Sequence, residues 1–124
     1  MQIGGDTDRD GIVTAPGEGE RFDRGDRIIT IKADLPQMSV LELSFDTTFS
    51  VAPHLHDDHV DSFHVLEGRV EFVVGGRTIL AGPGTTVVAP PGTTHGFRNA
   101  GDGWARLLNV HAPDAGFADG VRTL

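Results

Sequence analysis

The feature that most constrains the fold of this chain is a succession of short apolar segments, each ended by a turn rich in Gly, Pro or Asp. Val, Ile, Leu, Thr and Phe dominate these segments, and such residues favour β-strands. Gly75-Gly76 separates two of the segments and is typical of a hairpin turn. Evenly spaced short strands without a long helical period predict an all-β sandwich or barrel. The expected strands are residues 27–33, 38–45, 52–56, 62–66, 70–74, 77–81, 85–89, 94–99 and 104–111.

The residues before and after the expected strands predict an arm, a barrel and a tail. Residues 1–26 form an N-terminal arm that packs on the barrel or on a partner subunit, residues 27–113 form the barrel, and residues 114–124 form a tail or a short helix. A chain of 124 residues can build one core without a disulfide or a structural metal. No internal repeat is evident, so one barrel is expected and not two.

Composition narrows the classes of function. Cysteine is absent, so any metal must be held by nitrogen and oxygen ligands. The formal net charge of -8 repels phosphate backbones, which argues against a nucleic-acid partner. No apolar run approaches the roughly 20 residues that span a bilayer, and the N-terminus does not resemble a secretory signal. The expected location is therefore cytoplasmic, with no membrane association.

Histidine is concentrated where chemistry is expected, with four of the six histidines between residues 53 and 64. His54 and His56 are separated by one residue, and alternate side chains of a strand share a face. Two imidazoles that point into a barrel need partners, and a metal ion satisfies both. Asp61 can complete a face of two histidines and one acid that leaves coordination positions open.

Two spaced patterns carry a family resemblance. In the first, four residues separate the His54–His56 pair from Asp61, and six residues separate Asp61 from Gly68. This resembles the first motif of the cupin superfamily, H-x-H-x(3,4)-E-x6-G. The second cupin motif, G-x5-P-x-G-x2-H-x3-N, is matched at every fixed position. The matching residues are Gly84, Pro90, Gly92, His95 and Asn99.

The resemblance implies a single jelly-roll barrel, or double-stranded β-helix, that holds one divalent ion (Fe, Mn, Ni, Co or Zn). It implies that His54, His56, Asp61 and His95 are the metal ligands. The most similar group by pattern is the quercetin dioxygenase-like single-domain cupins, which implies a metal-dependent oxygenase acting on a small organic molecule with Asp61 as general base. Two alternatives stay open: a non-catalytic module that holds metal or ligand, and a metal-dependent isomerase or lyase. Small cupins usually pair, so a homodimer is expected.

The chain departs from the family pattern at two positions. Thr48 stands where the first motif has glycine, and Asp61 replaces the glutamate. Because aspartate is one methylene shorter, Asp61 is expected to reach the metal only with a backbone shift or through a water molecule. Its role is therefore expected to lie in chemistry more than in holding the ion.

Strand alternation places further residues around the expected site. Phe97 shares the parity of His95, and Phe63 shares that of Asp61, so both should line an apolar substrate pocket. His59 also shares the parity of Asp61 and is a candidate for the pocket, for contact with a ligand residue or for a substitute ligand. A solvent-exposed loop position is nevertheless the expectation for His59. His111 is expected to be structural.

Overall fold

The computed structural model describes residues 11–124, and within them it contains ten strands and one helix. The nine predicted segments correspond to strands β2 to β10, while β1 lies inside the predicted arm. The strands are β1 (Glu20–Asp23), β2 (Arg27–Asp34), β3 (Ser39–Phe45), β4 (Ser50–His54), β5 (Val60–Glu67), β6 (Val70–Val74), β7 (Arg77–Ala81), β8 (Thr86–Ala89), β9 (His95–Asn99) and β10 (Ala105–Ala112), and the helix is α2 (Phe117–Thr123).

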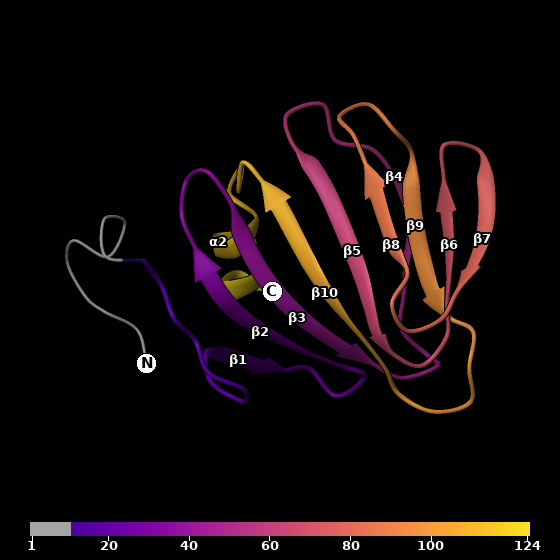
Figure 1. Cartoon of the computed structure of the whole chain (residues 1–124), viewed down its shortest axis with the longest axis horizontal. Helices are drawn as coiled ribbons and strands as arrows, with labels where there is room; N and C mark the ends of the chain where they lie inside the picture. Colours follow the sequence, from indigo (N-terminus) through magenta and orange to yellow (C-terminus); the bar gives the residue numbers. More distant parts are fainter. Residues whose placement is uncertain (1–10) are drawn as a thin grey trace.

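The strands form two antiparallel sheets that face each other (Figure 1). One sheet has the order β1-β2-β3-β10-β5-β8, and the other has the order β4-β9-β6-β7. Several neighbouring strands are distant in sequence, as in β10 between β3 and β5, because the chain passes repeatedly from one sheet to the other after β3. This is the all-β jelly-roll barrel that the sequence predicts, and that prediction is confirmed.

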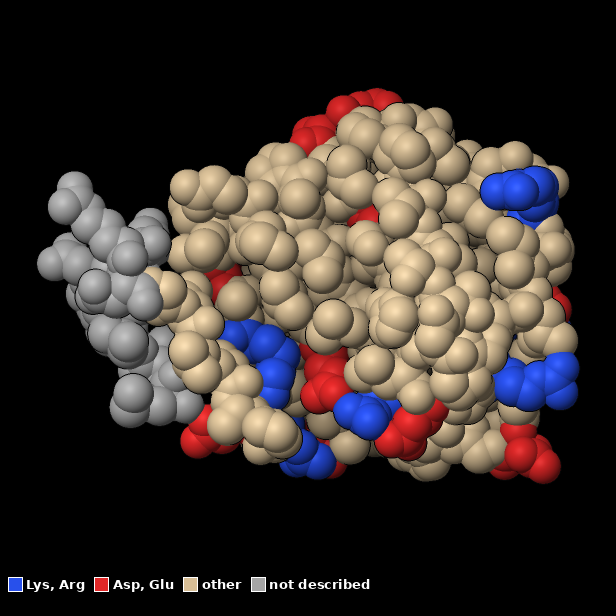
Figure 2. Space-filling model, in the orientation of Figure 1, with Lys and Arg blue, Asp and Glu red and all other residues tan. Residues whose placement is uncertain are grey.

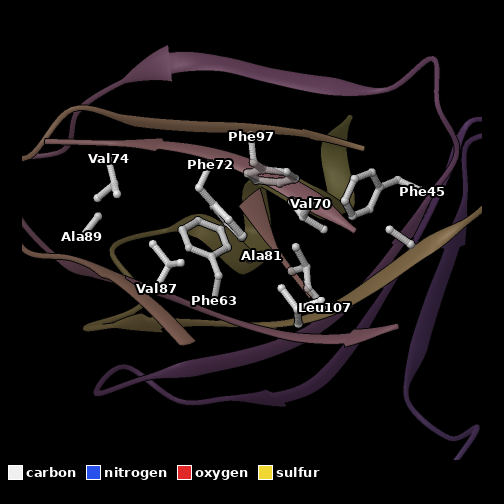
Figure 3. Close-up of a cluster of buried hydrophobic side chains, with 12 residues drawn as sticks. Phe45, Phe63, Val70, Phe72, Val74, Ala81, Val87, Ala89, Phe97 and Leu107 are labelled. Atoms are coloured by element: carbon white, nitrogen blue, oxygen red, sulfur yellow. The ribbon is translucent and has the colours of Figure 1, made fainter. Parts of the chain in front are cut away.

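The core lies between the two sheets and is built around aromatic rings (Figure 3). Burial alternates along β5, which is the pattern of a strand with one face toward the core. The ring centroids of Phe63, Phe72 and Phe97 are 5.3 to 5.8 Å apart, within the range of favourable aromatic pairs. Burial of one such side chain is worth about 1.5–3 kcal/mol. The barrel therefore has an apolar core that does not depend on the polar residues near its mouth.

The first described strand and the C-terminal helix pack on the larger sheet. Strand β1 pairs with β2, so residues 20–23 of the predicted arm extend the chain's own sheet. Helix α2 lies beside β2 and β3, where Ala118 and Val121 pack against Ile31 and Leu41 (Figure 1). Residues 1–10 of the arm lie outside the described residues. No helix in the described part of the chain has the length and apolar character to cross a membrane.

Charged side chains of both signs are interspersed on the surface. On the face drawn in Figure 2, Lys and Arg alternate with Asp and Glu along the lower edge, and most of the remainder is uncharged. Because of this mixture and the net charge of -8, we still expect no nucleic-acid partner.

Candidate metal centre

Strand pairing brings the predicted site residues together from β4, β5, β9 and the loop between β4 and β5. His54 at the end of β4 lies directly opposite His95 at the start of β9. Asp61 on β5 lies directly opposite His111 on β10. His56 follows β4, and its carbonyl accepts a hydrogen bond from the amide of Gly92 at 2.6 Å. That bond joins the loops that carry the two sequence patterns, so the register of the barrel sets the positions of the histidines.

Three imidazoles converge with their ring nitrogens toward one point. One ring nitrogen from each of His54, His56 and His95 lies within 4.8 Å of the others. Nδ1 of His54 is 2.8 Å from the carbonyl oxygen of Ala52, and Nδ1 of His95 is 2.9 Å from that of Thr93. A carbonyl only accepts, so Nδ1 carries the proton in both rings and Nε2 keeps its lone pair. Such bonds fix the tautomer and orientation of metal-ligating histidines.

Asp61 is buried among these rings, with 4% of its surface exposed. Its Oδ2 lies 3.0 Å from Nε2 of His95 and 3.9 Å from Nε2 of His56. Its Oδ1 accepts a hydrogen bond from Nδ2 of Asn109 at 2.7 Å and lies 3.1 Å from Nε2 of His111. One carboxylate oxygen is thus held by the last strand, and the other faces the imidazole cluster.

The protonation states suit a cation. Burial alone would raise the pKa of Asp61, but the hydrogen bond and charge of His111, followed by the bond from Asn109, lower it overall. The pKa of His56 is lowered, first by burial and then by the nearby imidazoles of His59 and His54, against the opposing charge of Asp61. At neutral pH, Asp61 is therefore a carboxylate and His56 is a neutral imidazole, which are the forms that bind metal.

The contact between His95 and Asp61 tests whether these residues fit a metal ion. The lone pair of His95 Nε2 faces a carboxylate oxygen at 3.0 Å, so two acceptors point at each other. Buried acceptors in this arrangement are costly unless a proton or a cation lies between them. A donor set of imidazole nitrogen and carboxylate oxygen suits Fe, Mn, Ni, Co or Zn. The residues therefore fit a divalent ion.

An apolar cavity of about 260 Å³ opens onto the cluster. Phe63 and Phe97, the residues predicted for a substrate pocket, lie in its wall. Among the described residues that line the cavity, Arg27 is the only Lys or Arg, and its guanidinium is already paired with Asp26 at 2.8 Å. The polar end of the cavity is formed by the metal-centre residues and their neighbours on β10. The full lining is Arg27, Ile29, Leu41, Leu43, Phe49, Val51, His54, His56, Asp61, Phe63, Phe97, Asn109, His111, Phe117, Val121 and Leu124.

His59 corrects one expectation from the sequence. The predicted exposed loop position is wrong, because only 6% of His59 is exposed. Its ring lies against His56, with centroids 4.2 Å apart, and 5.1 Å from the ring of His111. His59 is also not among the described residues that line the cavity. Its Nδ1 contacts Asp58 at 2.8 Å, and its Nε2 is buried without a hydrogen-bond partner.

Asn109 was missed by the sequence reasoning and His111 was expected to be structural, yet both lie at the site. Both contact Asp61, and His111 also stacks on Phe117 of α2, with ring centroids 3.7 Å apart. Neither belongs to the two spaced patterns. The available signal was the alternation along β10, which places Leu107, Asn109 and His111 on the buried face.

Comparison with known proteins gives the same fold. The family model described as "Cupin domain" matches residues 44–111. The solved structure of KdgF from Halomonas sp. is 24% identical, with 83% of this chain and 94% of that chain covered and a TM-score of 0.76. An RmlC-like cupin from Shewanella frigidimarina is 20% identical, with 81% and 89% covered and a TM-score of 0.72. A predicted oxalate decarboxylase from Thermotoga maritima is 18% identical, with 82% and 99% covered and a TM-score of 0.73.

At these identities the three solved structures establish the fold alone. Among curated proteins, none matches the sequence.

Proposed function

The chain belongs to the cupin domain family, and from that membership we propose that it is a metal-binding cupin with dioxygenase-like activity on a small apolar organic molecule. The proposed ligands of one divalent ion are the imidazoles of His54, His56 and His95 and the carboxylate of Asp61. The ion is Fe, Mn, Ni, Co or Zn. The observation that carries the proposal is the convergence of these groups beside an apolar cavity that His54, His56 and Asp61 line.

The metal ion, Asp61 and the apolar wall of the cavity have different roles in the proposed reaction. A bound divalent ion supplies Lewis acidity and orients an oxygen-bearing substrate. Asp61 accepts a proton from the substrate, because its Oδ2 faces the cluster while Oδ1 is held by Asn109 and His111. The apolar wall excludes water, which strengthens electrostatic interactions at the reacting atoms.

The cavity supports a substrate that is small and mostly apolar. By proportion to the roughly 150 Å³ cavity that holds benzene, a 260 Å³ cavity accepts about ten non-hydrogen atoms. Phe49, Phe63 and Phe97 in the wall favour a ring. Arg27, already paired with Asp26 and lying 4.9 Å from the ring centroid of Phe49, is not free to bind a second anion strongly. A single aromatic ring with one or two oxygen substituents fits these constraints.

A metal-dependent isomerase or lyase is the second candidate. The buried contact between Asp61 and His111 favours it, because paired titratable groups can carry a proton between two positions of a substrate. Oxygen consumption separates the two candidates, since proton transfer alone consumes none.

The proposal is tested by metal analysis of untagged protein, followed by oxygen uptake. We expect about one equivalent of a transition metal per chain by mass spectrometry. We then expect oxygen consumption with one or more members of a panel of catechols, other uncharged phenols and small diketones. The His56→Ala variant is the control and should lose both.

The outcomes separate the possibilities. Protein that holds no metal, and takes up none after incubation with each candidate ion, contradicts the proposal as a whole. Metal-loaded protein that converts a panel member without oxygen consumption is an isomerase or lyase. Metal-loaded protein that binds panel members and converts none of them is a non-catalytic module.

A further inference from the structure

We infer that this metal centre has a second position for its ion, in which His59 takes the place of His54 and His95 and the ligands are His56, His59 and Asp61. The inference rests on the proposed metal binding, and His59 is not a position of either sequence pattern. One ligand atom from each of these three residues lies within 4.8 Å of the other two. The same criterion is met by His54, His56 and His95, so two overlapping triads share His56.

The environment of His59 is that of a metal ligand without its metal. Asp58 is an exposed carboxylate and only accepts, so the Nδ1 of His59 donates the hydrogen bond between them at 2.8 Å. The proton is then on Nδ1, and Nε2 keeps a lone pair that is buried without a partner. A buried unpaired imidazole nitrogen costs free energy, which a cation recovers. Carboxylate contacts of this kind also orient the histidines of known metal sites.

The two positions are adjacent and exclude each other. Nε2 of His56 lies 3.1 Å from Nε2 of His54 and 3.9 Å from Oδ2 of Asp61, so the same nitrogen faces both triads. One nitrogen lone pair binds one ion, and a single ion therefore occupies either position. The ion would move toward the buried side of the cluster, because His59 and Asp61 are both buried whereas His54 is more accessible.

This arrangement predicts that loss of His54 does not abolish metal binding. The test is titration of metal-free protein with Co²⁺ by calorimetry, together with the visible absorption of bound Co²⁺. Wild type should bind one equivalent. His54→Ala should still bind one equivalent, with affinity reduced about 10- to 100-fold and an altered Co²⁺ spectrum. The double variant His54→Ala/His59→Ala should bind Co²⁺ about 10- to 100-fold more weakly than His54→Ala, because only His56, His95 and Asp61 remain.

The controls keep a failure of folding apart from a failure of the inference. His64 lies on the opposite face of β5, where its Nδ1 contacts Thr86 Oγ1 at 2.7 Å, so His54→Ala/His64→Ala should bind as His54→Ala does. Circular dichroism checks each variant, and His59→Gln replaces His59→Ala if the alanine variant is unfolded.

The inference is overturned if His54→Ala binds no Co²⁺, or if the double variant with His59 binds as well as His54→Ala alone. In both cases wild type still binds one equivalent, and the proposed metal binding stands. If wild type itself binds none, the proposed function fails and the inference fails with it.

Discussion

Asp61 is the residue at which this chain departs most from the pattern of its family, and its surroundings offset the shorter side chain. The Asn109 amide and the His111 imidazole hold Oδ1, while Oδ2 reaches within 3.0 Å of His95 Nε2. A carboxylate whose orientation is fixed by two neighbours does not need the metal to hold it. It is therefore available to contribute basicity at an open coordination position, which stays a prediction from the sequence.

Asp61→Asn tests this division of roles. The amide oxygen can still accept from Asn109 and His111, but the charge and basicity are gone. We expect metal affinity to fall about tenfold, because the new amide can donate to His95 and competes with the ion. Turnover on an identified substrate should fall about 10²- to 10⁴-fold, the usual contribution of a general base. Calorimetry and steady-state kinetics measure the two effects separately.

Asp57→Asn is the matched control, since Asp57 is exposed, lies near the site and is not among the described residues that line the cavity. It should leave both quantities unchanged. Complete loss of metal in Asp61→Asn would make Asp61 a required ligand and not a separate base. Full turnover would leave the three histidines as the whole active site.

At the scale of strands and helices, the sequence predicts what depends on local pattern. Alternation and turns locate the nine segments that become β2 to β10, and the two spaced motifs locate His54, His56, Asp61 and His95. Strand β1 was missed because its four residues, Glu-Arg-Phe-Asp, carry a single apolar side chain and form a strand only against β2. The contact of His111 with Asp61 depends on the register of β10 against β5, which no local pattern encodes.

Helix α2 is anchored by one cation, which gives a prediction at this scale. Arg122 pairs with Glu20 of β1 at 2.6 Å, with Asp34 of β2 at 2.9 Å and with Asp119 at 2.7 Å. Partly exposed ion pairs contribute little to global stability, so Arg122→Gln should lower the free energy of unfolding by only about 1 kcal/mol. The amides of α2 should nevertheless exchange faster with deuterium, because local opening no longer breaks these pairs.

The same anchor should respond to acid. The hydrogen bond from Arg122 lowers the pKa of Glu20, slightly opposed by burial. Stabilisation by Glu20 is therefore complete above its ordinary pKa of about 4.3 and is lost as the pH falls through the lower pKa of the folded state. The rate of hydrogen–deuterium exchange of the α2 amides, corrected for the intrinsic exchange rate at each pH, should rise below about pH 4 in wild type. The same rate should change less in Arg122→Gln.

Arg98→Gln is the control for both measurements, because Arg98 pairs with Glu71 on the other sheet, at 2.9 Å. An α2 that stays fully protected in Arg122→Gln would show that its apolar contacts alone hold it.

At the scale of the whole molecule, the edges of the two sheets bear on assembly. Within the described residues, β1 and β8 end one sheet, and β4 and β7 end the other. Edge strands present unpaired backbone groups that invite pairing with a second chain. Two of these edges also carry exposed apolar side chains, Leu80 on β7 at 53% and Val88 on β8 at 50%. A second copy of the chain that paired with one of these edges would satisfy its backbone groups and cover its apolar side chain.

We therefore expect a homodimer in solution. Size-exclusion chromatography with light scattering should give twice the mass of the 13.2 kDa chain at micromolar concentrations. Leu80→Lys and Val88→Lys, made separately, identify the edge that forms the dimer interface. A lysine at the centre of the interface dissociates the dimer and lowers the apparent mass, whereas a lysine on a free edge leaves the mass unchanged. A wild-type mass of one chain throughout the micromolar range contradicts the expectation.

The last prediction is that the barrel folds without metal and that bound metal adds to its stability. Phe45 and Phe72, at 0% and 1% exposure, belong to a core between the sheets that is built from twelve buried hydrophobic residues. We therefore expect metal-free protein to be folded, with a β-sheet circular dichroism spectrum and a cooperative thermal transition.

Metal that binds only the folded state adds about 2.7 kcal/mol to the free energy of unfolding when its free concentration is a hundred times Kd, which raises Tm by several degrees in a domain of this size. His56→Ala should keep the metal-free Tm within a few degrees, since His56 is only partly buried, and should lose the increase on adding metal. Metal-free wild type that is unfolded would instead make the centre a structural site, because the free energy of metal binding would then be needed to fold the barrel.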